Sequence, residues 1–457
     1  MLDQDYRPQA IQDSRSDGLN IGFGFDPVGN LTALTAPGNT APVVSLGYDN
    51  LDRLTAFKDG PTGTVIDGYS YDATGNRLSA QVNGGTQTYN YPTDSHRLAG
   101  VTGAARSYDG AGNTTAIDGT AREFAYDATG RLSQAKRSGT LAMEYRYNDR
   151  GEQVRRFLGT TNTYTLYDEA GHWLGDYDTN GKALQQAIWL DDLPVGVLAG
   201  TTLNYVQPDH LGAPRTVIDP VRDVAIWKWD IKGEAFGNTP PDQDADRDGT
   251  AFVFGMRFPG QRYDSATGLN QNYFRDYDAT GGRYTQSDPT GLGGGASTYG
   301  YAGGTPLAAV DRFGLIVKVV ENDPAVARLL MSAYAELNAG SEVARFMNGE
   351  LERSSDVYEI RVSRDGRNLY CPLGSGSLSS CGGRERTVFV DPCHMPQVKT
   401  TAGLQTIPLP IAIAHELGHA WLGYQDNPGR GDPVGDNIRM IENPIRAEMN
   451  IPLRTEY

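Results

Sequence analysis

Cysteine is nearly absent from this chain of 457 residues, which holds only three. They are Cys371, Cys381 and Cys393, so no disulfide framework can hold the long region before them. A bridge from Cys371 to Cys381 or to Cys393 is one option for these thiols, and free buried thiols are another.

Basic residues and long apolar runs are scarce as well. The 40 Lys and Arg are outnumbered by 56 Asp and Glu, which gives a formal net charge of −16. Because phosphate contacts depend on Lys and Arg, we expect no nucleic-acid binding. No apolar run approaches the roughly 20 residues that span a bilayer, so we expect no membrane span. The polar N-terminus is no secretory signal, so if the protein leaves its cell, another machine or a missing N-terminal region must export it.

Glycine and tyrosine are abundant instead. The chain has 56 Gly, and its 25 Tyr outnumber 13 Phe. This mixture favours many short strands and turns over a helical bundle. The length is enough for about two to four domains.

One repeated unit dominates residues 20–290. It reads aromatic-x-Tyr-Asp-x-x-Gly-(Asn or Arg)-x-Leu, and some copies are one residue shorter before the Leu. The alternating aromatic residues predict a strand with one buried face, and Asp-x-x-Gly predicts a turn in which Gly can take a positive φ. Such units cannot bury their own faces alone, so they must stack. The copies begin at Phe23, Leu46, Tyr69, Tyr108, Phe124 and Tyr145.

This unit resembles the tyrosine–aspartate repeat of the RHS/YD family. Residues 208–215 and 258–284 resemble two further elements of that family, in family order, and the resemblance covers about residues 20–315. It implies a spiral β-sheet that closes into a hollow shell around a toxin domain. We therefore expect residues 1–287 to form a segment of a mainly-β shell, and the chain to be the last portion of a longer protein. The resemblance also implies that the missing N-terminal part loads the protein onto a specialised secretion apparatus.

An acidic stretch interrupts this region at residues 240–250. Asp244, Asp246 and Asp248, followed by Gly249, partly fit a calcium-binding EF-hand loop. The closing Glu of such a loop is missing, because Gly255 stands in its place. We therefore expect an exposed loop here rather than an ion site.

Residues 288–315 resemble the self-cleavage module of the RHS/YD family, which cuts its own chain after a second Gly-Leu. The resemblance implies that Asp288 and Asp311 are the catalytic acids and that the bond cut is Leu315–Ile316. Two carboxylates that share a proton can activate a water molecule, as in aspartic proteases.

Two departures weaken this comparison. Arg312 stands where the family has Pro, and Thr305 stands where it has Asn. The alternative is that both aspartates only cap turns.

Residues 316–457 have a different composition and contain His415-Glu416-x-x-His419 inside an apolar run. On a helix, positions i and i+4 share a face, so the two imidazoles can hold one Zn²⁺. Glu416 is then placed to act as the general base on a water molecule. The alternative is a chance match to a short pattern.

A catalytic zinc needs a third protein ligand. Glu442 and Glu448 are both candidates. Glu442 is the first choice, because Arg446 at i+4 can hold its carboxylate in place. The alternative for either residue is a solvated carboxylate on a surface helix.

About the last sixty residues resemble the NleD-type effector zinc peptidases, through residues 415–419, 442–448 and 452–457. The resemblance implies a protein substrate in a target cell, and Arg454 or Tyr457 as the group that stabilises the oxyanion. We expect a small α+β, gluzincin-like domain. Its expected elements are strands at 316–320, 357–362 and 387–390, a helix at 323–337, the zinc helix and a last helix with Glu442.

Together these features predict an RHS toxin whose shell encloses a zinc metalloendopeptidase and releases it by autoproteolysis. A bacterial target would imply a cognate immunity protein. The alternative is a YD-repeat surface or recognition protein whose terminal domain only binds. A zinc nucleobase deaminase is excluded because residues 391–396 lack the second cysteine of its motif.

Overall fold

The chain divides into two compact units, residues 1–289 with 296–315 and residues 290–295 with 316–457. None of the helices in the described part is long and apolar enough to cross a membrane. The computed structural model describes residues 7–26, 29–82, 84–148, 150–288, 297–312, 314, 359–362, 369–371, 387–390, 397–422, 438–449 and 451–455.

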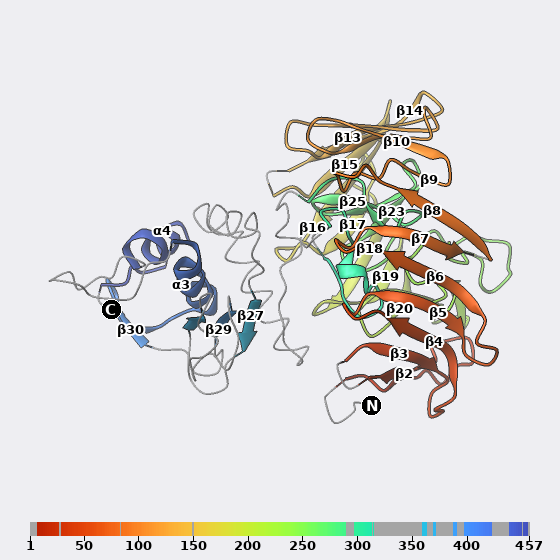
Figure 1. The fold of residues 1–457 in the computed structure, drawn as a ribbon, viewed down its shortest axis with the longest axis horizontal. Helices are drawn as coiled ribbons and strands as arrows, with labels where there is room; N and C mark the ends of the chain where they lie inside the picture. Colours follow the sequence, from red (N-terminus) through yellow and green to blue (C-terminus); the bar gives the residue numbers. More distant parts are fainter. Residues whose placement is uncertain are drawn as a thin grey trace. The chain divides into compact units, whose positions relative to one another are not determined.

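The first unit is built on a 22-stranded antiparallel sheet, in which each strand pairs with the next along the chain (Figure 1). Such a meander is what short strands joined by tight turns predict. Its strands are β1 (Ala10–Ile11), β2 (Ile21–Phe25), β3 (Leu31–Thr35), β4 (Pro42–Tyr48), β5 (Leu54–Asp59), β6 (Val65–Tyr71), β7 (Arg77–Val82), β8 (Gly85–Asn90), β9 (Gly100–Val101), β10 (Ala104–Tyr108), β11 (Thr114–Ile117), β12 (Arg122–Tyr126), β13 (Leu132–Arg137), β14 (Thr140–Tyr147), β15 (Gln153–Leu158), β16 (Thr161–Tyr167), β17 (Trp173–Tyr177), β18 (Ala183–Leu190), β19 (Leu193–Ala199), β20 (Thr202–Pro208), β21 (Pro214–Asp219) and β22 (Val224–Lys228).

The repeat forms the predicted strand–turn–strand unit. In the copy at Asp72, the Asp72 N–H donates to the Asn76 carbonyl at 2.9 Å, and the Gly75 N–H donates back to the Asp72 carbonyl at 3.2 Å. The Asp72 carboxylate also accepts the Asn76 N–H at 2.9 Å. Gly75 has φ +85°, a backbone that favours glycine. The predicted turn is therefore confirmed.

The repeat tyrosine joins successive hairpins. The hydroxyl of Tyr71, at the end of β6, donates to the carbonyl of Leu54, at the start of β5, at 2.9 Å. Tyr147 makes the same bond to Leu132 at 2.9 Å. The Tyr and Leu of the unit are thus fixed by a contact between neighbouring copies.

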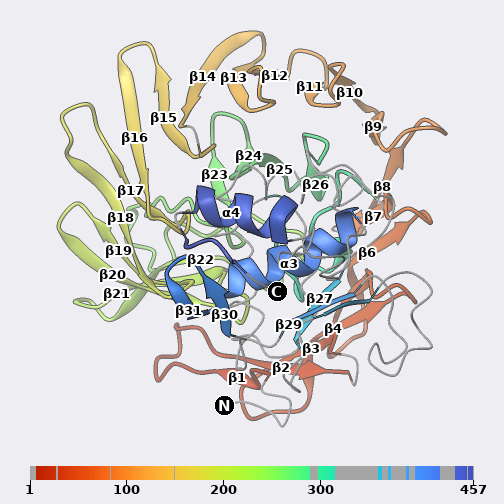
Figure 2. The same ribbon diagram turned by 90° about the vertical axis from the view of Figure 1, so that its left-hand side faces the viewer.

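The meander runs around a ring, with later residues of the same unit inside it (Figure 2). The segment between β1 and β2 is joined to β20 and β22 by polar contacts. The Leu19 N–H donates to Oε1 of Gln207 on β20 at 2.7 Å, and the Ala225 N–H of β22 donates to Oδ2 of Asp17 at 2.7 Å. The inner residues form a buried four-stranded sheet of β23 (Arg262–Asp264), β24 (Leu269–Asn272), β25 (Arg275–Asp278) and β26 (Arg283–Tyr284), followed by the 3-10 turn η2 (Ala302–Gly304).

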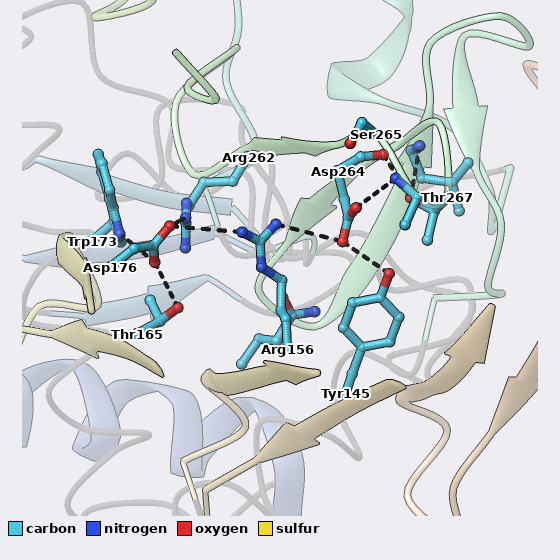
Figure 3. A network of polar contacts seen from close by, with 12 residues as sticks. Tyr145, Arg156, Thr165, Trp173, Asp176, Arg262, Asp264, Ser265 and Thr267 are labelled. Carbon is cyan, nitrogen blue, oxygen red and sulfur yellow. Dashed lines mark hydrogen bonds and ion pairs between the residues drawn. The ribbon is translucent and has the colours of Figure 1, made fainter. Parts of the chain in front are cut away.

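Charges of alternating sign connect the ring to the inner sheet (Figure 3). Asp264 of β23 accepts the hydroxyl of Tyr145 at 2.8 Å and lies 3.6 Å from Arg156 of β15. Arg156 in turn lies 3.8 Å from Asp176 of β17, which also pairs with Arg262 at 2.5 Å. Burial raises the pKa of Asp176, but the two arginines outweigh burial and hold it below its usual value. Each charge is compensated, as partly buried ions require.

One buried carboxyl of the inner sheet differs from this pattern. Asp276 of β25 is almost fully buried, and its Oδ2 accepts Nε2 of Gln286 at 2.7 Å. Burial raises the pKa of Asp276 to about 7. The folded chain therefore holds a proton on Asp276 that the unfolded chain releases between pH 4 and 7.

Stability should consequently fall as the pH rises through this interval. At pH 8 the variant Asp276→Asn, which mimics the protonated carboxyl, should be more stable than the parent by roughly 2 to 4 kcal/mol. At pH 4 the two should unfold at nearly the same denaturant concentration. Urea unfolding at both pH values measures this, with the exposed Asp94→Asn as the matched control. Equal stabilities at pH 8 would show that Asp276 is not held protonated by the fold.

The second unit is described in part. A three-stranded sheet has the order β27 (Glu359–Val362), β29 (Thr387–Val390), β28 (Leu369–Cys371), and a hairpin joins β30 (Gln397–Thr400) to β31 (Gly403–Thr406). The strand predicted at 357–362 is present over Glu359–Val362, and the strand predicted at 387–390 is present. The predicted strand at 316–320 and helix at 323–337, and Cys381 and Cys393, lie outside the described residues. The helical elements are α3 (Leu409–Leu422), the π-helical turn η5 (Ile438–Glu442) and α4 (Asn443–Glu448).

Candidate functional site

The two aspartates of the expected self-cleavage module meet at one arginine. Nη2 of Arg275, on β25, lies 2.7 Å from Oδ2 of Asp288 and 3.4 Å from Oδ2 of Asp311. The three side chains are 1%, 2% and 0% exposed. One guanidinium thus compensates two carboxylates that are almost completely shielded from bulk solvent. The sequence analysis did not identify Arg275, although it lies within residues 258–284, the end of the repeat core.

Hydrogen bonds from neighbouring side chains hold both the carboxylate and the backbone carbonyl of Asp311. The hydroxyl of Tyr284 donates to Oδ2 of Asp311 at 2.7 Å, and Nδ2 of Asn272 donates to the Asp311 carbonyl at 2.8 Å. Burial, together with the negative charge of Asp311, raises the pKa of Tyr284 well above its usual value. Tyr284 therefore keeps its proton and acts as a donor.

The chain passes close to this centre just before the expected cut. Nε of Arg275 donates to the carbonyl of Gly314. Gly314 has φ +69°, and a Cβ there would lie 2.8 Å from the carbonyl oxygen of Asn272. A larger residue would therefore push the chain away from β24 and β25. Leu315 and Ile316 lie outside the described residues.

The family departure at Thr305 has a local consequence. Its hydroxyl donates to the Ala302 carbonyl at 2.8 Å and closes the turn η2. The other departure, Arg312, forms an ion pair with Asp192 on the ring.

The apolar run forms the predicted helix, α3. Pro408 precedes it and Pro410 lies in its first turn, where a missing N–H costs no helical hydrogen bond. His415 and Glu416 are 7% and 6% exposed. The side chain of His419 lies outside what the structure describes. The buried apolar residues of α3 are Ile411, Ala412, Ile413, Ala414 and Leu417.

Glu442, the last residue of η5, contacts the helix α3. Its Oε2 lies 2.9 Å from Nδ1 of His415, and the residue is 0% exposed. Nε of Arg446 donates to Oε1 of Glu442 at 2.7 Å, so the predicted i+4 contact is confirmed. Nη1 of Arg454 donates to Oε2 at 3.1 Å. Burial raises the pKa of Glu442, but His415, Arg454 and Arg446 outweigh burial and hold it below its usual value.

The described donors are of the kinds that zinc binds. His415 offers a buried imidazole beside the buried carboxylate of Glu442, and Glu416 is the next residue on the helix. Glu442 contacts Nδ1 of the ring, so it can either orient His415 or bind the metal beside it. Glu448, the other candidate ligand, is exposed on α4. Tyr457 lies outside the described residues.

The acidic loop holds an arginine among its carboxylates. Within the part of the chain that the structure describes, Asp244, Asp246 and Asp248 are the group of three acidic ligands close enough for one ion, within 4.8 Å. Nη1 of Arg222 lies 2.6 Å from Asp246 and 2.8 Å from Asp248. Arg222 therefore compensates two of these three carboxylates.

The first unit has known relatives. Residues 19–292 match the family model Teneurin YD-shell. The chain is 26% identical over 369 residues to toxin protein Tse5 of Pseudomonas aeruginosa, covering 65% of this chain and 27% of that protein. It is 27% identical over 337 residues to double-stranded DNA deaminase toxin A of Burkholderia cenocepacia, covering 64% and 22%. The chain thus spans about a quarter of the length of these relatives.

A solved structure shares the architecture. The Tc holotoxin pore of Photorhabdus luminescens matches with a TM-score of 0.52 and 17% identity, over 71% of this chain and 18% of that chain. This likeness concerns the fold alone. It confirms the expected mainly-β shell, a large antiparallel sheet.

Proposed function

Because the chain belongs to the teneurin YD-shell family, we propose that it is the C-terminal part of a toxin whose β-shell carries a zinc endopeptidase and releases it by cutting after Leu315. Two relatives that are toxins by name support the toxin role. Since the chain covers only part of them, the endopeptidase activity is argued from its own residues.

One observation carries the endopeptidase proposal, the buried contact of 2.9 Å between His415 and Glu442. It joins the helix of the His-Glu-x-x-His motif to the one acidic residue that the sequence favoured as a third ligand. A solvated surface carboxylate would not be fully buried between two arginines and an imidazole.

The residues of α3, those of η5 and α4, and Arg454 have distinct tasks in this proposal. His415, His419 and Glu442 would hold Zn²⁺, which would polarise a peptide carbonyl and lower the pKa of a water molecule. Glu416 takes a proton from the attacking water and passes it to the leaving amine. Arg446 and Arg454 fix the carboxylate of Glu442.

Self-cleavage uses a separate centre. Arg275 holds the Asp288 and Asp311 carboxylates beside the chain that leads to the Leu315–Ile316 bond. One carboxylate takes a proton from a water molecule as that water adds to the Leu315 carbonyl. The same proton then goes to the Ile316 nitrogen as the C–N bond breaks. The products are a carboxylic acid at Leu315 and a free amine at Ile316.

Zinc content tests the metal site directly. The purified full chain should bind about one equivalent of zinc, and Glu442→Ala should weaken zinc binding by roughly 10- to 100-fold or more. The matched control is Glu448→Ala, because Glu448 is exposed on α4, the helix that directly follows Glu442, and its loss should leave the zinc content unchanged. Metal analysis after dialysis against a weak chelator measures both. If only the Glu448 variant loses zinc, Glu442 is not part of the site.

The proposed partners follow from the activity. The substrate is a protein of the target cell, and a bacterial target would require a cognate immunity protein in the producing cell. Delivery would use a secretion apparatus.

A further inference from the structure

Arg312, the residue after Asp311, is joined to the ring by a chain of alternating charges. Its Nη1 lies 2.5 Å from Oδ1 of Asp192. The same Oδ1 lies 3.0 Å from Nε2 of His172, and Nδ1 of His172 lies 2.9 Å from Oδ2 of Asp168. We refer to Arg312, Asp192, His172 and Asp168 as the relay.

The ring end of the relay is firmly positioned. His172 ends a repeat turn, where its N–H donates to Oδ1 of Asp168 at 2.8 Å. Its ring stacks on Trp189 of β18 with centroids 4.5 Å apart and an interplanar angle of 24°. Asp192 lies between β18 and β19. The turns β16–β17 and β18–β19, together with Trp189 of β18, therefore fix the carboxylate that Arg312 contacts.

The charges in the relay support one another. Burial lowers the pKa of His172, but its hydrogen bonds to Asp192 and Asp168 outweigh burial and raise it above its usual value. The bond to His172 and the charge of Arg312 hold the pKa of Asp192 well below its usual range, against the effect of burial. Asp192 is therefore a stable anion for Arg312.

The backbone at Arg312 is also confined. A Cβ on Gly260, whose φ is +84°, would lie 2.0 Å from the Arg312 carbonyl oxygen. The chain thus passes directly over the turn at residues 258–261. One residue earlier, the Asp311 carbonyl accepts Nδ2 of Asn272 at 2.8 Å. Side chain and backbone together fix the path of the chain beside Arg275.

We propose that Arg312 is a positioning residue for self-cleavage, and that its ion pair with Asp192, supported by His172, keeps Asp311 on Arg275 and the chain in place for the cut. This inference rests on the proposed self-cleavage. The family pattern to which residues 288–315 are similar has proline where this chain has Arg312, and the proline ring fixes φ without any partner. Arginine allows a wider range of φ, so in this chain the ion pair with Asp192 supplies the constraint.

The test follows self-cleavage of the full chain by pulse-chase in a cell-free translation reaction. Arg312→Ala and Asp192→Asn should each slow the cut about 10- to 100-fold, since a displaced reacting group loses rate steeply. The double variant should be no slower than the slower single one, because both remove the same contact. Arg312→Lys should be cut within about threefold of the parental rate, since the lysine ammonium can also pair with Asp192.

The matched control is Arg247→Ala. Arg247 pairs with Asp242 at 2.7 Å in the same unit but on the acidic loop, so the variant should cut at the parental rate. Arg312→Pro should also cut efficiently, and adding Asp192→Asn to it should change nothing. If Arg312→Ala is cut at the parental rate, the proposed positioning role of Arg312 is wrong. It is also wrong if Arg312→Lys is cut as slowly as Arg312→Ala. Failure of the proposed self-cleavage gives another result: the parent stays uncut, or Asp288→Asn is cut as fast as the parent.

Discussion

Replacing Asp288 by Asn should abolish the fragment that begins at Ile316. In the structure Asp288 and Asp311 share the guanidinium of Arg275 at 2.7 and 3.4 Å. An amide of the same shape cannot take a proton from water, so the rate should fall by more than about 100-fold. The full chain, expressed and separated on a gel, shows the cut, and N-terminal sequencing of the smaller fragment shows its position.

The exposed Asp94→Asn serves as the control for this substitution, because it removes one charge from the same unit without touching the centre. It should leave the cut unchanged. Asp311→Asn should be at least as slow as Asp288→Asn, since Asp311 also accepts the hydroxyl of Tyr284. A parent chain that is never cut, or an Asp288 variant that is cut normally, would leave Arg275 as a purely structural link between two loops.

The fold of the first unit could be predicted because residues close together in the sequence determine each of its hairpins. Each copy carries its own turn, so Asp72, Gly75 and Asn76 determine a hairpin without help from distant residues. The same turn recurs at Asp168, Asp178 and Asp209. The sequence analysis did not count these as copies, because the aromatic residues before them are partly replaced. The Asp-x-x-Gly residues that make these turns are therefore a better sequence signal than the aromatic pattern.

The candidate sites could be predicted only in part, because their contacts join distant residues. The family resemblance indicated Asp288 and Asp311, but no local pattern shows that Arg275 lies between them. Arg312 was only a departure from the family until the structure placed it on Asp192. Glu442 could be predicted as the preferred acid, since Arg446 is its neighbour at i+4. Its contact with His415 depends on how α3 and η5 pack, which no spacing in the sequence determines.

Replacing Glu416 by Gln should abolish endopeptidase activity while zinc remains bound. Glu416 is buried next to His415 on α3 and is assigned to proton transfer, not to metal binding. Loss of a general base lowers rates by about 100- to 10,000-fold, whereas the ligands of the metal are unchanged. His415→Ala should lose both zinc and activity. The pair of variants therefore separates the base from the ligand.

The measurement is a survey of new protein N-termini in target-cell extract incubated with the self-cleaved chain. The parent should produce termini that are absent with Glu416→Gln and absent after removal of zinc, and present again when zinc is returned. Glu448→Gln, an exposed carboxylate of the same unit, should behave as the parent. If zinc binds and Glu416→Gln changes no terminus, the metal holds the domain together instead of cutting protein. The unit would then be a binding domain carried by the shell, because a buried imidazole–carboxylate pair can stabilise a small fold through a metal as well as catalyse with one.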